Sequence, residues 1–501
     1  HVTNHLKKTS SIHWHGIVLP TGMDGVPGLS FGGIAPGETF TYRFKVQQHG
    51  TYWYHSHSGF QEQTGVYGAI VIKPKKKEPF RYERDYVVLL SDWSDENPMT
   101  IYKKLKQMSG YYNFNQRTVG TFFEEVKEKG LSNALSDRKM WNEMRMGDRD
   151  LSDVTGYTYT FLMNGNNPAT QFKALFKKGE KIRLRFINAA AMTFFDVRIP
   201  GLKMTVVAAD GHHVKPVSID EFRIGVAETY DVIVEPDDNR AYAIFAQSID
   251  RSGYAMGSLT PNLSLLAKAP AMDALPVLTH ADMGMDMDMV SMDQGGGMKC
   301  SSAMKCSSAM KMPKDSMKRY KFAEMEAQKY PITKLPMKRG VETDMMATSP
   351  RYRLDDPGVG LRNNGRKVLT YADLKNRYST HKARKPDREI ILHLTGNMER
   401  FMWSINGIKY ADAEPLEFQY GERIRITFIN DTMMNHPMHL HGMWSDLETG
   451  DDDHLVRKHT VVVQPGAKIS YRVYVDAKGR WAYHCHMLYH MAGMFREVRV
   501  T

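Results

Sequence analysis

Short runs of alternating apolar and polar residues, separated by turn signals, predict β-strands along most of the chain. One predicted strand occurs twice, because residues 179–188 read GEKIRLRFIN and residues 421–430 read GERIRITFIN. An Asn-Gly turn precedes each copy, at Asn164-Gly165 and at Asn406-Gly407. Since a repeated strand with its turn indicates a repeated fold, we expect the same β architecture to be used more than once.

A second repeat extends this prediction to both ends of the chain. Residues 36–44 (PGETFTYRF) and residues 465–473 (PGAKISYRV) each combine a Pro-Gly turn with a predicted strand. We expect three β domains, at residues 1–95, 153–270 and 386–501. Residues 96–152 are rich in Lys, Glu and Met at helical spacing and predict a helical connector, whereas residues 271–385 form a methionine-rich insert and linker.

Composition narrows the class of protein. A chain of 501 residues has room for roughly three domains. The sequence has no run of about 20 apolar residues, so it predicts no membrane-spanning segment. Lys and Arg number 67 against 56 Asp and Glu, but these residues are scattered outside any nucleic-acid motif, so we interpret the net charge of +11 as solvated surface. The three cysteines are too few for a disulfide framework.

Histidines occur in pairs spaced by one residue at both ends of the chain. Residues i and i+2 of a strand point to the same face, so each pair presents two imidazoles together. Cys485 lies between the histidines of the last pair and faces the opposite side, where His436, His490 and Met494 can join it. Two His, one Cys and a weak Met are the ligands of a blue-copper electron-transfer site. The four pairs are His13 and His15, His55 and His57, His439 and His441, and His484 and His486.

These segments resemble the copper signatures of the multicopper oxidases, and the resemblance covers nearly the whole chain. The copper-resistance branch of periplasmic oxidases is more similar, because residues 56–65 (SHSGFQEQTG) and the methionine-rich insert also fit it. The resemblance implies an all-β fold of three cupredoxin-like Greek-key β-sandwich domains, with the helical connector and the insert. It also implies four copper ions: one type 1, one type 2 and a type 3 pair. The first histidine motif begins at residue 13, too early for the opening strands or a signal peptide, so we expect the true N-terminus to be missing.

The resemblance also assigns the ligands. Cys485 ligates the type 1 copper, and its neighbours His484 and His486 ligate the cluster, which gives a short covalent path for electrons. Because each half of the cluster draws on both chain ends, the first and third domains must close on each other. A single histidine pair would be interpreted as part of a surface strand, but four pairs with a shared Cys make that interpretation very weak. His13 and His439 hold the type 2 copper; His15, His55 and His486 hold one type 3 copper; His57, His441 and His484 hold the other.

Other residues carry weaker assignments. Met494 is where the family places the axial ligand, and its thioether lowers the copper potential relative to Leu or Phe, although a core Met is the alternative. Reducing dioxygen also consumes protons, and the places where relatives carry carboxylates hold Thr64 and Met491. Glu62 or Asp92 can substitute, or either is an ordinary surface or capping residue. All the remaining histidines are assigned to surface or packing, among them His5, His49, His212, His213, His280, His393 and His454.

The methionine-rich insert offers soft ligands that select Cu(I). A disordered linker is the alternative, although such linkers are usually rich in Gly, Ser, Pro or charge. Five further methionines lie close in sequence to the type 1 ligands, at Met433, Met434, Met438, Met443 and Met487, and for any one of them packing is the simpler interpretation. The insert contains Met283, Met285, Met287, Met289, Met292, Met298, Met304, Met310, Met312 and Met317, together with Cys300 and Cys306.

The sequence therefore predicts a periplasmic oxidase that converts Cu(I) to Cu(II), reduces dioxygen to water and serves copper resistance, supplied by a periplasmic copper-carrier protein. A laccase-like phenol oxidase with the same ligands is the first alternative. A non-enzymatic copper carrier or store is the second, although storage has no use for a bonded electron path. Copper nitrite reductase is excluded, because its type 1 Cys is flanked by one cluster-type histidine rather than two.

Overall fold

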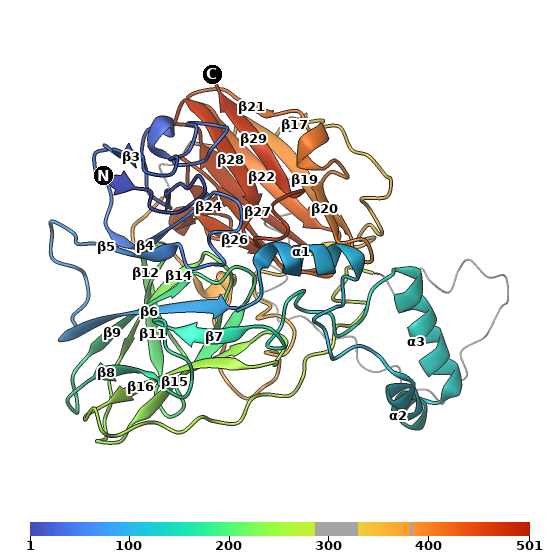
Figure 1. Cartoon of the computed structure of the whole chain (residues 1–501), viewed down its shortest axis with the longest axis horizontal. Helices are drawn as coiled ribbons and strands as arrows, with labels where there is room; N and C mark the ends of the chain where they lie inside the picture. The colour runs from blue at the N-terminus through green and yellow to red at the C-terminus, as the bar shows by residue number, and fades with distance from the viewer. Residues whose placement is uncertain (286–328, 381–383) are drawn as a thin grey trace.

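The computed structural model describes residues 1–285, 329–380 and 384–501, and consists mainly of β-sheets (Figure 1). We divide the strands into an N-terminal unit (β1–β5), a middle unit (β6–β16) and a C-terminal unit (β17–β29). The all-β, cupredoxin-like fold class is confirmed. The exact domain boundaries stay a prediction.

The N-terminal unit contains two small sheets, β1-β3 and β2-β4-β5. The strand expected after Pro36 is short, because its partner β1 offers only two residues for pairing: Val2 lies opposite Phe40 and Thr3 opposite Thr39. The strands are β1 (Val2–Thr3), β2 (His13–His15), β3 (Thr39–Phe40), β4 (Gly50–His55) and β5 (Tyr67–Ile72).

The middle unit contains two sheets, ordered β13-β10-β15-β16-β8 and β12-β11-β14-β9-β6-β7. Strand β6 lies in the range 1–95 but pairs in parallel with β9, so it belongs to this sheet. The strands are β6 (Arg84–Trp93), β7 (Thr160–Met163), β8 (Phe172–Leu175), β9 (Ile182–Asn188), β10 (Phe195–Arg198), β11 (Met204–Ala209), β12 (His212–Ile219), β13 (Glu221–Ile224), β14 (Thr229–Val234), β15 (Tyr242–Ser248) and β16 (Tyr254–Thr260).

The C-terminal unit contains an eight-stranded sheet, β17-β19-β22-β27-β24-β25 with β18 on β27 and β20 on β19, and a five-stranded sheet, β21-β29-β28-β23-β26. The strands are β17 (Ile332–Thr333), β18 (Arg351–Tyr352), β19 (Arg388–Asn397), β20 (Met402–Ile405), β21 (Leu416–Phe418), β22 (Arg423–Asn430), β23 (His436–Leu440), β24 (Ser445–Leu447), β25 (Val456–Lys458), β26 (Thr460–Val463), β27 (Ala467–Tyr474), β28 (Gly479–Cys485) and β29 (Phe495–Val500).

The repeated sequence forms the same central strand in two units. Strand β9 lies between parallel β6 and antiparallel β14, and β22 lies between parallel β19 and antiparallel β27. The preceding Asn164 and Asn406 have φ of 49° and 54°, in the left-handed region that Asn-Gly hairpin turns require. The prediction of a repeated β fold is confirmed.

Three helices occupy the predicted connector: α1 (Pro98–Gln107), α2 (Val119–Lys129) and α3 (Leu131–Glu143). Helix α1 begins where the Asn97 side chain accepts a hydrogen bond from the amide of Met99. Its Lys106 Nζ donates to the carbonyl of Phe401 at 2.6 Å, which ties α1 to the C-terminal unit. Helices α2 and α3 project from the body of the molecule (Figure 1). Among the described residues, no helix is long and apolar enough to cross a membrane.

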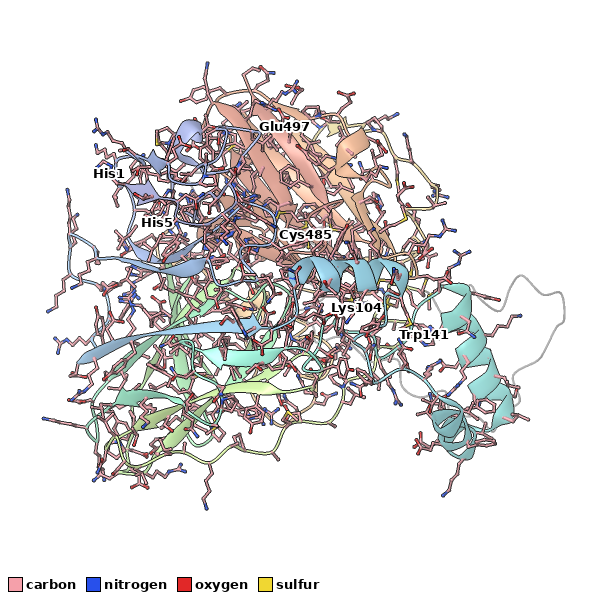
Figure 2. All side chains as sticks on the ribbon, viewed as in Figure 1. His1, His5, Lys104, Trp141, Cys485 and Glu497 are labelled. Atoms are coloured by element: carbon pink, nitrogen blue, oxygen red, sulfur yellow. The ribbon has the colours of Figure 1, made fainter. Side chains whose placement is uncertain are left out.

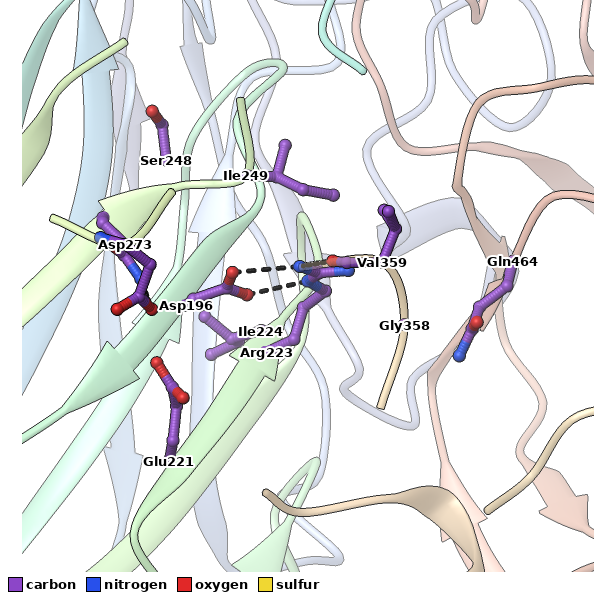
Figure 3. Close-up of polar contacts among 12 residues, drawn as sticks. Asp196, Glu221, Arg223, Ile224, Ser248, Ile249, Asp273, Gly358, Val359 and Gln464 are labelled. Carbon is purple, nitrogen blue, oxygen red and sulfur yellow. Dashed lines mark hydrogen bonds and ion pairs between the residues drawn. The ribbon is translucent and has the colours of Figure 1, made fainter. Parts of the chain in front are cut away.

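The chain that leads into the C-terminal unit is bound to the middle unit by charge. Asp196 accepts hydrogen bonds from Arg223 at 2.7 and 2.9 Å (Figure 3). It also forms an ion pair with Arg251 at 2.7 Å. Arg223 also donates to the carbonyl of Val359, and Arg366 forms an ion pair with Glu221 at 2.7 Å. These contacts fix the two units against each other.

Of the insert and linker, residues 271–285, 329–380 and 384–385 lie among the described residues. Met283 is fully buried, and Met285 packs against the main hydrophobic core. The methionines from Met287 to Met317, with Cys300 and Cys306, lie outside the described residues.

Candidate metal centres

A pair of neighbouring strands builds the predicted type 1 site. Strand β23 begins at His436, β28 ends at Cys485, and the two strands pair so that Met438 lies opposite Cys485. The Cys485 Sγ lies 3.5 Å from the Nδ1 of His436 and 3.8 Å from the Nδ1 of His490. These two Nδ1 atoms are 3.4 Å apart. All three side chains are fully buried, and Figure 2 shows Cys485 inside the body of the molecule.

The outer nitrogens of both type 1 histidines have their own partners. His436 Nε2 lies 2.6 Å from the hydroxyl of Thr432, and His490 Nε2 lies 2.8 Å from a carboxylate oxygen of Asp153. Such contacts fix the orientation of a metal-binding imidazole, and they leave both Nδ1 atoms facing the sulfur. The residues therefore fit a copper ion.

The remaining type 1 residues are consistent with this arrangement. Burial raises the pKa of the Cys485 thiol, and a bound metal would hold it as the thiolate. Met494 is fully buried, its amide donates to the carbonyl of His490, and its carbonyl accepts from the amide of Cys485. Because Met494 lies in the same turn as His490, it stays beside the type 1 site.

The four histidine pairs meet between the N-terminal and C-terminal units. His13 lies opposite His55 in the β2–β4 pair, and His439 lies opposite His484 in the β23–β28 pair. The structure thus brings the two chain ends together, as the sequence predicts. The contacts are His57 Nε2 to His484 Nε2 at 3.3 Å, His441 Nε2 to His484 Nε2 at 3.0 Å, His55 Nε2 to His486 Nε2 at 3.2 Å, and stacked His15 and His439 rings at 3.8 Å.

The two proposed type 2 ligands are oriented by backbone carbonyls. His13 Nδ1 lies 2.8 Å from the carbonyl of Asp24, and His439 Nδ1 lies 2.6 Å from the carbonyl of His459. The Nε2 atoms of both histidines are buried and have no hydrogen-bond partner. Buried polar atoms normally have partners, so these nitrogens fit a metal ion.

Burial also sets the charge state of the cluster. It lowers the pKa of His484 to about 3, and those of His15, His55, His57, His439, His441 and His486 fall well below the usual value, with desolvation as the largest cause. Neutral imidazole is the form that binds metals. Copper bound here would supply one-electron redox chemistry and a site for dioxygen.

The two candidate proton donors lie in different surroundings. Glu62 is buried, with one carboxylate oxygen 3.1 Å from His55 Nδ1 and the other 3.8 Å from His486 Nδ1. Desolvation, together with the charge of Asp92, raises its pKa well above the usual value. Asp92 instead accepts hydrogen bonds from the amides of residues 191–193 and from the hydroxyl of Thr193. Its contacts are those of a capping residue, whereas Glu62 touches two proposed ligands.

Three functional neighbours were missed from the sequence. Asp153 contacts His490, Asp24 contacts His441 Nδ1 at 2.8 Å, and His459 lies 3.1 Å from His15. Each is distant in sequence from its partner and belongs to no spaced motif. The only signal in the sequence that could have indicated Asp24 was its position close to the first histidine motif.

Three family models, all described as multicopper oxidase, match residues 1–77, 84–260 and 383–501. The chain belongs to the multicopper oxidase family and is an oxidoreductase. More particularly, it is 58% identical to copper resistance protein A of Escherichia coli, over all of this chain and 85% of the relative. It is 55% identical to copper resistance protein A of Pseudomonas syringae pv. tomato, with the same coverage. Both the family and the resemblance to its copper-resistance branch are confirmed.

Solved structures agree on the fold. The iron-import multicopper oxidase Fet3p matches with a TM-score of 0.61 and 17% identity, over 99% of this chain and 82% of that chain. The laccase from Botrytis aclada matches with a TM-score of 0.62 and 19% identity, over 99% and 79%. These likenesses support the cupredoxin-like architecture.

Proposed function

We propose that the chain oxidises Cu(I) to Cu(II) and passes the electrons to dioxygen, which is reduced to water. Four copper ions would serve this reaction: a type 1 ion at Cys485, a type 2 ion at His13 and His439, and a type 3 pair at the other six histidines of the pairs. A role in copper resistance in the periplasm, with copper delivered by a carrier protein, is supported by the likeness to copper resistance protein A.

The burial of His490 is the observation that favours Cu(I) over phenols. Its ring has no exposed surface and stacks on Trp403 with centroids 3.8 Å apart, while its Nε2 contacts Asp153. An aromatic donor would need an open pocket at this imidazole. A small donor needs only a nearby site from which an electron can reach the type 1 copper.

A cavity with ligands suited to Cu(I) lies beside the contact between His490 and Asp153. It has a volume of about 420 Å³ and is lined in part by Met146, Met398 and Asp150. Asp150 lies near Asp153, and burial raises the pKa of both carboxyls to about 7. Thioethers select Cu(I). Arginines also line the cavity. The positive charge of Arg117 is offset there by its ion pair with Asp148 at 2.7 Å.

The methionines near the type 1 ligands do not extend this site to the surface. None of the five lines the cavity, and each is exposed by 3% or less, so packing describes them best. A role of the methionine-rich insert in acquiring Cu(I) rests on its composition alone. The five buried residues are Met433, Met434, Met438, Met443 and Met487.

Oxygen uptake by the copper-loaded protein tests the proposal, with Cu(I) and a phenol compared as donors. The Met146→Leu/Met398→Leu double variant should raise the apparent KM for Cu(I) roughly tenfold by removing two soft ligands, without affecting phenol oxidation. Deleting residues 286–317 should raise it as well, and this deletion spares the buried Met283. Met443→Leu, which is buried outside the cavity, serves as the matched control.

Three results would contradict the proposal in different ways. Faster turnover of the phenol than of Cu(I) would identify a laccase-like oxidase. Copper binding without oxygen uptake from either donor would indicate a carrier or store. An unchanged KM for Cu(I) in both altered proteins would remove the cavity and the insert from the pathway.

A further inference from the structure

We propose that His459 is a positioning residue for the copper cluster, which orients His15 and His439 together and connects both to Asp210 of the middle unit. His459 has no second histidine one residue away along the chain, so it is not among the eight paired histidines. The inference rests on the proposed function, because it takes His15 and His439 as copper ligands.

The first contact runs through the backbone of His459. Its carbonyl accepts a hydrogen bond from His439 Nδ1 at 2.6 Å. The proton of the neutral His439 ring is therefore held at Nδ1, and the buried, unpartnered Nε2 faces the cluster.

The second contact runs through the side chain. His459 Nδ1, His15 Nε2 and the Thr460 hydroxyl lie 3.1 Å from one another. His15 Nδ1 is buried without a partner, so it is the nitrogen left for copper. When Nδ1 of a neutral imidazole binds a metal, Nε2 carries the proton and donates, and His459 Nδ1 is placed to accept.

The chain leaves space for this ring beside the first histidine motif. Gly16, which follows His15, has a φ of 77°, and a Cβ at this position would lie 2.5 Å from the Cδ2 atom of His459. Any other residue at position 16 would collide with the imidazole. The glycine thus permits the contact between His459 and His15.

Asp210, in the turn between β11 and β12, holds His459 from the middle unit. Its Oδ2 accepts hydrogen bonds from the amides of His459 at 3.1 Å and Thr460 at 3.2 Å. The buried Lys458 forms ion pairs with Asp210 and Glu228, both at 3.0 Å. Since a buried charge is stable only when paired, these residues fix the chain at the start of β26. The middle unit supplies none of the paired histidines, yet it sets the position of two of them.

Two substitutions of His459 separate hydrogen bonding from simple packing. His459→Asn keeps an acceptor near the position of Nδ1, whereas His459→Leu removes it at similar volume. In the copper-loaded full chain, His459→Leu should weaken retention of the type 3 copper at His15 about tenfold or more, as loss of a contact behind a metal ligand does. The type 2 electron paramagnetic resonance should stay as in the wild type, because the backbone carbonyl that holds His439 is unchanged. His459→Asn should preserve both. Thermal unfolding of the copper-free variants should be alike.

Asp210→Asn tests the connection to the middle unit without touching either ligand. Asp210 Oδ1 accepts from the amide of Thr229, so an asparagine would turn its NH₂ group toward the two amides that Oδ2 now satisfies. The type 2 resonance should shift, because the backbone of residue 459 that holds His439 loses its support, and the type 3 copper should be retained as weakly as in His459→Leu. His212→Leu is the matched control: this ring packs 4.5 Å from Trp444 and none of its ring contacts is with a proposed ligand.

The proposal is overturned if His459→Leu retains the wild-type copper count, or if Asp210→Asn leaves the type 2 resonance unchanged. It is also overturned if His459→Asn fails as badly as His459→Leu, because the ring itself would then be required, as a ligand or as packing. A wild-type protein that holds four coppers but consumes no oxygen with Cu(I) would defeat the proposed function and leave the positioning role intact.

Discussion

At the residue scale, the alternation of a strand separates two kinds of site. Cys485 faces His436 and His490, while its neighbours His484 and His486 face the histidines of the first chain end. If both sites bind copper as proposed, the peptide units on either side of Cys485 would connect the two centres, and electrons would have a short covalent path between them.

Removing this sulfur should separate the two centres in function. Cys485→Ser is expected to abolish the intense blue absorption of a thiolate–copper transition and to stop turnover, while the cluster stays largely loaded, because none of its proposed ligands changes. Visible absorption with copper analysis per chain measures both effects. A variant that kept its blue colour would disprove the type 1 assignment.

Glu62 offers a second test at this scale. Glu62→Gln keeps the size of the side chain but has no acidic proton, so dioxygen reduction should slow while Cu(I) still reduces the type 1 copper. Oxygen uptake and anaerobic bleaching of the blue colour measure the two steps separately. An unchanged rate of oxygen uptake would exclude Glu62 as the proton donor.

Sequence predicted the residues whose spacing encodes their geometry and missed those placed by the fold. The histidine pairs were found because each begins in a strand: β2 contains both His13 and His15, whereas His57, His441 and His486 follow the ends of β4, β23 and β28. Asp153 meets His490 across 337 residues, and His459 meets His15 across 444, so no local pattern could reveal either contact. The same limit left Glu62 and Asp92 unresolved, since both are buried and only the partners of their carboxylates separate them.

At the scale of elements, sheet pairing decides how the strands are grouped. The sequence predicted the repeat, and the structure gives β9 and β22 equivalent parallel and antiparallel partners. It did not predict that β6 joins the middle unit, because strand pairing between distant segments has no local signal. Asp92 lies on this strand and binds the loop that follows β9.

Removing the Asp92 carboxylate should therefore cost stability. Asp92→Ala leaves three buried amides and one hydroxyl without their acceptor, which should lower the free energy of unfolding by about 3 kcal/mol. Urea unfolding of the copper-free protein measures this loss. If stability held while oxygen uptake fell, a role in proton supply would be favoured over capping.

At the scale of the whole molecule, residues from opposite ends of the chain should behave as one site. His13→Ala and His439→Ala should both lose type 2 copper and dioxygen reduction, yet keep reduction of the blue copper by Cu(I). Copper analysis and stopped-flow absorption compare them. His212→Leu controls for the loss of a partly buried imidazole. Normal oxygen consumption in His13→Ala would contradict the interface between the chain ends.

The meeting of both chain ends also has a consequence for biosynthesis. A polypeptide emerging from the ribosome presents four cluster histidines by residue 57 but lacks their counterparts until residue 486 has been made. If the paired histidines bind copper as proposed, the cluster could not be complete before residue 486 has been made. Metal insertion would then be a late step of maturation, and a chain terminated before this residue would lack part of the cluster's ligands.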